Sequence, residues 1–135
     1  MSSTPNFPNV PNTGAVTVNN AAGTTPQAAF TAGAGGSIIR SLTAVNPDNE
    51  DHEMQLYLND ILVTECIVPA NSGVVLSSVY TEVFDFTSLK AFQTRINSEG
   101  VLWWQIEASL VIKFASKAGL TSGKTCILHV DGIDL

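Results

Sequence analysis

Short runs of alternating apolar and polar residues, separated by turn signals, cover most of the chain after residue 36. In "HEMQLYLND", Met54, Leu56 and Leu58 fall on one side of an extended chain. This period of two is typical of a half-buried β-strand. The apolar run "ILVTECIV" follows at once, which predicts a tight hairpin turn at Asn59 and Asp60.

The same pattern predicts strands along the rest of the chain. They are expected at residues 37–46, 52–60, 61–68, 74–80, 82–86, 91–97, 101–107, 109–115 and 125–130. Residues 87–93 alone have a helical character, of about one turn. Short strands spaced about ten residues apart, with turn signals between them, predict an all-β, antiparallel β-sandwich or barrel.

The first 30 residues have a different composition. Prolines punctuate a stretch of Ser, Thr, Asn, Ala and Gly, and proline disfavours helices and central strands. We therefore predict an extended N-terminal arm over residues 1–30, with one short strand at residues 15–19, and a β-sandwich domain over residues 31–135. "TAGAGG" is expected to be the hinge between them. Phe7, Val10 and Phe30 are the candidate anchors of the arm on a partner subunit.

Composition narrows the function classes. The chain has 135 residues, which suits one domain, and 13% of them are charged against about 25% in an ordinary soluble domain. We therefore expect part of the surface to face other protein. The net charge is −6, and the six Lys and Arg residues are scattered. Both features argue against binding to nucleic acid and against binding to an acidic membrane surface. The start lacks the features of a signal peptide, so a soluble protein made in a cytoplasm is expected.

Two cysteines, Cys66 and Cys126, lie 60 residues apart in apolar, strand-like runs. No C-x-x-C pair or Cys/His cluster accompanies them in the sequence, which argues against a metal site. Buried free thiols are the favoured interpretation, and a disulfide between them is the alternative.

"AGLTSGKT" (residues 118–125) fits the loose pattern of a phosphate-binding loop. Such a loop needs a following helix, whereas "TCILHVDGIDL" alternates like a strand and ends the sequence. We therefore expect a surface turn and no nucleotide. Lys117 and Lys124 would then be candidate contacts with an acidic surface, such as the turn "NPDNEDHE" (residues 46–53) of a neighbouring copy.

No pattern of catalytic, cofactor-binding or metal-ligating residues stands out. "NPDNEDHE" lacks the spacing of a calcium loop, and no nucleophile motif accompanies the two histidines. His129 is expected in mid-strand with a structural role. Trp103 and Trp104 are adjacent in a predicted strand, so one faces the core and the other faces solvent, a loop or another chain. Either is a candidate contact residue, and the chain is not expected to be an enzyme.

Two stretches, "FTAGAGGSIIRSLTAVN" and "MQLYLNDILVTECIVPA", together with the uncharged N-terminal segment, resemble small virion proteins of tailed bacteriophages. The resemblance covers about residues 28–86 and implies a jelly-roll-like sandwich. It also implies a capsid cement or decoration protein, often trimeric, that sits over junctions between capsomers. The expected partners are further copies of the chain and the major capsid protein, and the expected location is the virion surface. The alternatives are a tail, neck or baseplate protein and a jelly-roll module that binds carbohydrate or a host surface.

Overall fold

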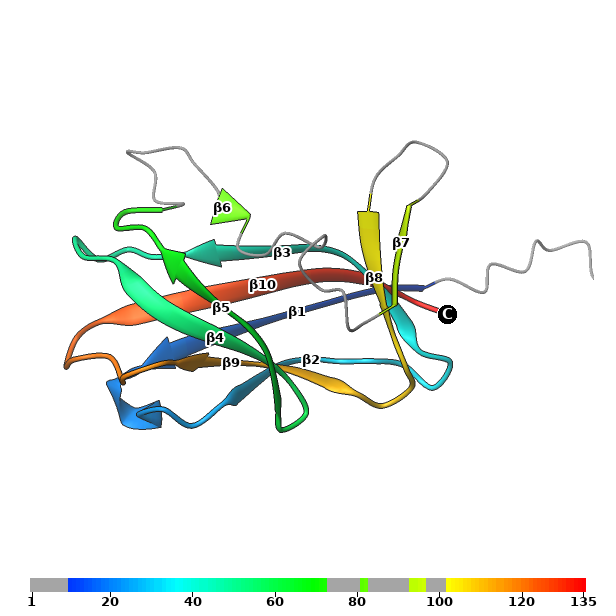
Figure 1. Cartoon of the computed structure of the whole chain (residues 1–135), viewed down its shortest axis with the longest axis horizontal. Coiled ribbons are helices and arrows are strands. Elements are labelled where there is room, and N and C mark those ends of the chain that lie inside the picture. Colours follow the sequence, from blue (N-terminus) through cyan, green and yellow to red (C-terminus); the bar gives the residue numbers. More distant parts are fainter. Residues whose placement is uncertain (1–9, 73–80, 83–92, 97–101) are drawn as a thin grey trace, which may run out of the picture.

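The computed structural model of the chain describes residues 10–72, 81–82, 93–96 and 102–135. These residues form two antiparallel β-sheets that pack face to face as a sandwich (Figure 1), which confirms the predicted all-β class. The strands are β1 (Val10–Asn19), β2 (Gln27–Thr31), β3 (Ser37–Val45), β4 (His52–Leu58), β5 (Ile61–Val68), β6 (Thr81–Glu82), β7 (Gln93–Ile96), β8 (Leu102–Ile106), β9 (Val111–Ser116) and β10 (Thr125–Asp134). A 3-10 turn, η1 (Asn20–Ala22), lies between β1 and β2.

The strands pair like one long hairpin that has been rolled up. β1 pairs with β10, β2 with β9, β3 with β8 and β4 with β5, so each pair is nested inside the one before. The pairs β10–β3 and β9–β4 join them into a first sheet, β1-β10-β3-β8, and a second sheet, β2-β9-β4-β5. This strand order is that of a jelly roll. β7 and β6 extend the first sheet beside β8 and β3.

The turn between β4 and β5 confirms the predicted hairpin. Asn59 has a φ of 53°, the left-handed conformation that a tight two-residue turn needs and that Asn adopts more readily than most residues. Leu58 pairs with Ile61 directly across the turn. The second predicted hairpin, between β7 and β8, is also present in the pairing. The predicted strand at residues 74–80, most of that at 82–86 and the helical turn at 87–93 lie outside the described residues, apart from Glu82 and Gln93.

The core lies between the two sheets and takes side chains from all eight jelly-roll strands. Met54 and Leu56 of β4 are fully buried, as the alternation predicts, and so is Trp104 of β8. Burying an apolar side chain of this size contributes about 1.5–3 kcal/mol to folding. Other core residues are Val18, Phe30, Ile39, Leu42, Val68, Ile112, Phe114, Cys126, Leu128 and Val130. Among the described residues, no helix is long and apolar enough to cross a membrane.

The arm predicted for residues 1–30 is wrong from Val10 onward. Residues 10–19 form β1, which pairs with β10 along its whole length, and residues 27–31 form β2 in the second sheet. Proline is compatible with β1 because this is the edge strand of its sheet, where a missing N–H can face away from the ladder. Threonines such as Thr13 and Thr17 give its exposed face polarity without charge. Residues 1–9 lie outside the described part.

The β1 and β2 edges close against each other, so this side of the sandwich is shut. A Cβ at Gly14 of β1 would overlap the carbonyl oxygen of Ala29 in β2, and only glycine permits this approach. The Asn12 side chain bridges the same two strands by donating to the carbonyl of Thr31 at 3.1 Å. "TAGAGG" is therefore a connection from β2 to β3, from one sheet to the other, and not the predicted hinge between arm and domain.

Candidate functional site

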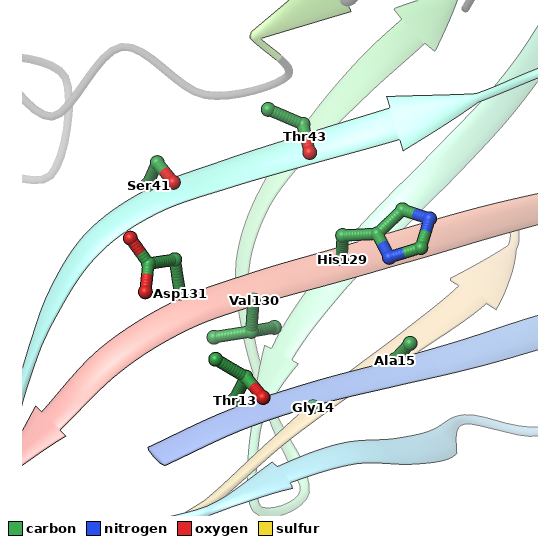
Figure 2. A pocket seen from close by; sticks show the side chains of 8 residues that line it. All are labelled: Thr13, Gly14, Ala15, Ser41, Thr43, His129, Val130 and Asp131. Carbon is green, nitrogen blue, oxygen red and sulfur yellow. The ribbon is translucent and has the colours of Figure 1, made fainter. Parts of the chain in front are cut away.

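The outer face of the first sheet has a shallow hollow of about 500 Å³ over β1, β10 and β3 (Figure 2). Its lining residues are Thr13, Gly14, Ala15, Ser41, Thr43, His129, Val130 and Asp131. The hollow lies on the β1 side of this face, where β10 is flanked by the edge strand β1 and by β3.

Two side chains of β10 form the ends of the hollow. His129 and Asp131 are two residues apart on the strand, a separation of about 7 Å. Val130 between them points into the core and is 2% exposed, so the floor between the two ends is backbone. The residues opposite them on the neighbouring strands are small. Asp131 is flanked by Thr13 and Ser41, and His129 is flanked by Ala15 and Thr43. Small flanking residues therefore leave the space open.

A β-bulge shapes one wall of the hollow. The register between β10 and β3 shifts after Asp131, which leaves Arg40 as an extra residue in β3. Ile39 and Leu42 on either side are both fully buried, so Arg40 and Ser41 between them are displaced from the core. Bulges commonly redirect side chains in this way. The Arg40 guanidinium reaches Asp131, with Nη2 3.0 Å from Oδ1.

The groups in the hollow suit hydrogen bonding better than nucleophilic catalysis. A serine nucleophile needs its general base within hydrogen-bond reach. Ser41 lies opposite Asp131 whereas His129 lies opposite Thr43, and the described residues include no hydrogen bond between Ser41 and His129. His129 lies in mid-strand, as expected, but its side chain is exposed. The structural role expected for it is therefore not supported by its position.

The acidic turn at residues 46–53 is a structural joint at one end of the sandwich. His52 Nε2 lies 2.7 Å from Asp48 Oδ2, and the N–H of Thr125 donates to the same oxygen at 2.9 Å. Burial raises the pKa of Asp48, but the hydrogen bonds from His52 and Thr125 outweigh it and hold that pKa below its ordinary value. Asn46 is fully buried and donates to the carbonyl of Val68 at 3.1 Å. The turn thereby ties the ends of β3 and β5 to the start of β10.

"AGLTSGKT" forms the loop from β9 to β10. Thr125, which would hold the metal in a phosphate-binding loop, is the first residue of strand β10, so the required helix is replaced by a strand. Gly119 and Gly123 have φ values of 87° and 81°, which are turn conformations that favour glycine. The N–H of Lys124 donates to the carbonyl of Thr121 at 3.0 Å and closes the turn.

The two loop lysines make their contacts within the chain. Lys117 Nζ lies 2.7 Å from Glu65 Oε2 of β5, and Lys124 Nζ lies 3.5 Å from Asn49 Oδ1 of the acidic turn. Lys124 therefore reaches "NPDNEDHE" of its own chain, whereas the predicted contact was with a neighbouring copy. The hydrogen bond from Lys117 lowers the pKa of Glu65, and the same bond raises the pKa of Lys117.

The other predicted contact residues separate into three groups. Phe30 is wrong as an external anchor, because it is 3% exposed and packs in the core near Gly132. Trp104 is likewise a core residue and not a contact residue. Val10 is 56% exposed and remains a candidate. Phe7 and the side chain of Trp103 lie outside the described residues.

An exposed apolar edge, formed by Ile61, Leu62 and Ile67 of β5, was not predicted as a site. These side chains are 68%, 44% and 60% exposed, and β5 is the edge strand of the second sheet. The only charged residue of β5 is Glu65, which is paired with Lys117. The sequence did contain a signal: "ILVTECIV" lacks the alternation of a strand with one solvated face.

Comparison of the chain with family models, with curated proteins and with solved structures finds no match in any of the three.

Proposed function

We propose that the chain is a structural virion protein, and specifically a capsid cement or decoration protein that stabilises a phage head by bridging capsomers. The observation that carries the proposal is the exposed apolar edge of β5, on the side of the jelly-roll sandwich opposite the closed β1–β2 side. Natural proteins protect exposed edge strands with Lys, Pro or a covering element, because an open edge invites pairing with another chain. β5 contains neither Lys nor Pro.

The edge suits an uncharged protein surface, which we assign to the major capsid protein. The one carboxylate of β5, that of Glu65, is paired with Lys117 at 2.7 Å, so this charge already has a partner when the edge docks. Each apolar side chain of this size contributes about 1.5–3 kcal/mol when it becomes fully buried. Three such side chains, two at the start of β5 and one near its end, therefore supply a useful affinity, although no single contact is strong.

Symmetry multiplies such a contact. A cement protein is present in many copies on a shell, and linked copies gain avidity without further contacts. We therefore retain a homo-oligomer, with a trimer favoured, as part of the proposal. The low content of charged residues, 13% of the chain, supports burial of further surface between copies.

The test is to image purified phage particles with and without the gene that encodes the chain. We expect density on the head at junctions between capsomers, and we expect particles that lack the chain to lose DNA at lower temperature or after osmotic shock. Density on the tail, neck or baseplate would instead support the alternative structural role. A virion role would be overturned if particles made without the chain show the same density as wild-type particles and keep full resistance to heat and osmotic shock.

A further inference from the structure

The hollow on the outer face of the first sheet carries no net charge of its own. Among the described residues that line it, Asp131 alone is acidic, and the Arg40 guanidinium at 3.0 Å neutralises it. A metal cation in the hollow would have one carboxylate ligand and would face this guanidinium. A phosphate would face the Asp131 carboxylate. Both kinds of ion are therefore disfavoured, and a neutral ligand is favoured.

The polar groups in the hollow match a ligand with several hydroxyls. Thr13, Ser41 and Thr43 present hydroxyls that donate and accept, the Asp131 carboxylate accepts, and the His129 imidazole offers a donor and an acceptor when neutral. They surround the hollow from three strands (Figure 2). A ring with hydroxyls on its rim would find a partner on each side of this arrangement.

The same hollow has apolar surface for the face of such a ring. The methyl group of Ala15 lies beside His129, and the imidazole itself is an exposed aromatic plane on the same wall. The backbone floor at Val130 lets a flat ligand approach closely. The volume of about 500 Å³ also lies within the usual range of ligand sites.

We propose that this hollow binds a neutral hexose unit, with Asp131 and Ser41 bonding its hydroxyls and His129 covering its ring. This goes beyond the structural role proposed above and does not depend on it, because the hollow lies on the first sheet and the apolar edge of β5 belongs to the second. Both surfaces can therefore be occupied at once.

The test is a titration of the isotope-labelled full chain, followed by NMR, with glucose, galactose and mannose and with neutral oligosaccharides made from them. We expect amide shifts at residues 41, 129 and 131, with a Kd in the millimolar range for a single hexose. Tighter binding of an oligosaccharide than of its monosaccharide would identify a glycan as the source. Equal binding would identify the free sugar.

Variants make the assignment specific to the hollow. His129→Ala and Asp131→Asn are expected to weaken hexose binding at least about tenfold, and both side chains lie on the outer face, so the core is left intact. Thr17→Ala is the matched control, because Thr17 is exposed on the same face of β1 opposite Ile127, outside the hollow. The proposal is overturned if no sugar of the panel shifts these amides. It is also overturned if hexose phosphates bind more tightly than hexoses, or if binding survives in both variants.

Discussion

Asp48 is the residue whose ionisation matters most for the joint at the end of the sandwich. Its carboxylate holds His52 at 2.7 Å and the N–H of Thr125 at 2.9 Å, and its side chain is 12% exposed. Folding lowers its pKa, so its contribution to stability is present above the ordinary value of 3.8. That contribution is lost as the pH falls through the lower pKa of the folded state.

Asp48→Asn is therefore expected to lower the free energy of unfolding by about 1–3 kcal/mol at about pH 7, because hydrogen bonds to a charged group are lost. The difference from the wild type should be smaller at about pH 2, because the contribution of the wild-type carboxylate is lost as the pH falls through its lowered pKa. Urea unfolding at both pH values measures this. Asp60→Asn is the control, since Asp60 is 94% exposed and its pair with Lys113 is worth less than about 1 kcal/mol. An equal loss at both pH values would show that the charge of Asp48 has no part in the joint.

The two cysteines are free thiols, as the favoured interpretation of the sequence predicted. Burial raises the pKa of each thiol to about 12. The reactive thiolate is then on the order of 10⁻⁴ of the total at about pH 8. Mass spectrometry after iodoacetamide treatment is expected to find neither Cys66 nor Cys126 labelled in the folded protein, and both labelled in urea without reductant. Rapid labelling of native Cys126 would contradict its place in the core.

At the scale of the strands, the sequence predicts correctly those features that depend only on residues close together in the chain. The hairpin at Asn59 and Asp60 follows from its turn residues, and the burial of Met54 and Leu56 follows from alternation. β1 was missed because its partner, β10, lies at the other end of the chain. Proline counts against a strand only until the strand is known to be at an edge.

The hollow could not be predicted for a related reason. Ser41, His129 and Asp131 are unremarkable in the sequence, and the pairing of β10 with β3 brings them to one face. The bulge that displaces Arg40 toward Asp131 depends on this long-range register. The sequence predicts that one of Trp103 and Trp104 faces the core, but it does not say which. Tertiary packing places Trp104 there.

Deletion of residues 2–30 tests the revised role of the N-terminal segment. The deletion removes β1 and most of β2, which leaves β10 and β9 each without one neighbour and opens the core around Val18. We expect the remaining chain to lose cooperative unfolding, as measured by circular dichroism during heating. A truncated protein that unfolds as cooperatively as the wild type would restore the picture of an arm attached to a complete domain.

At the scale of the whole molecule, the two long sides of the second sheet differ. Its β2 side is closed against β1 through Gly14, and its β5 side presents Ile61, Leu62 and Ile67 to solvent. An apolar run in the sequence predicts a strand, but it does not say which strand will end a sheet. The exposed edge therefore emerged only from the complete strand order, and it is the basis of the proposed docking to a shell.

The most direct measurement is the binding of purified chain to phage particles that were assembled without it, followed by co-sedimentation. Ile67→Lys places a charge near the Val68 end of the apolar edge, and Thr17→Lys adds the same charge to the exposed face of β1 as a matched control. We expect Ile67→Lys to weaken binding at least about tenfold and Thr17→Lys to bind like the wild type. Both variants must first show the wild-type circular dichroism spectrum. Wild-type binding by a folded Ile67→Lys variant would contradict docking through β5.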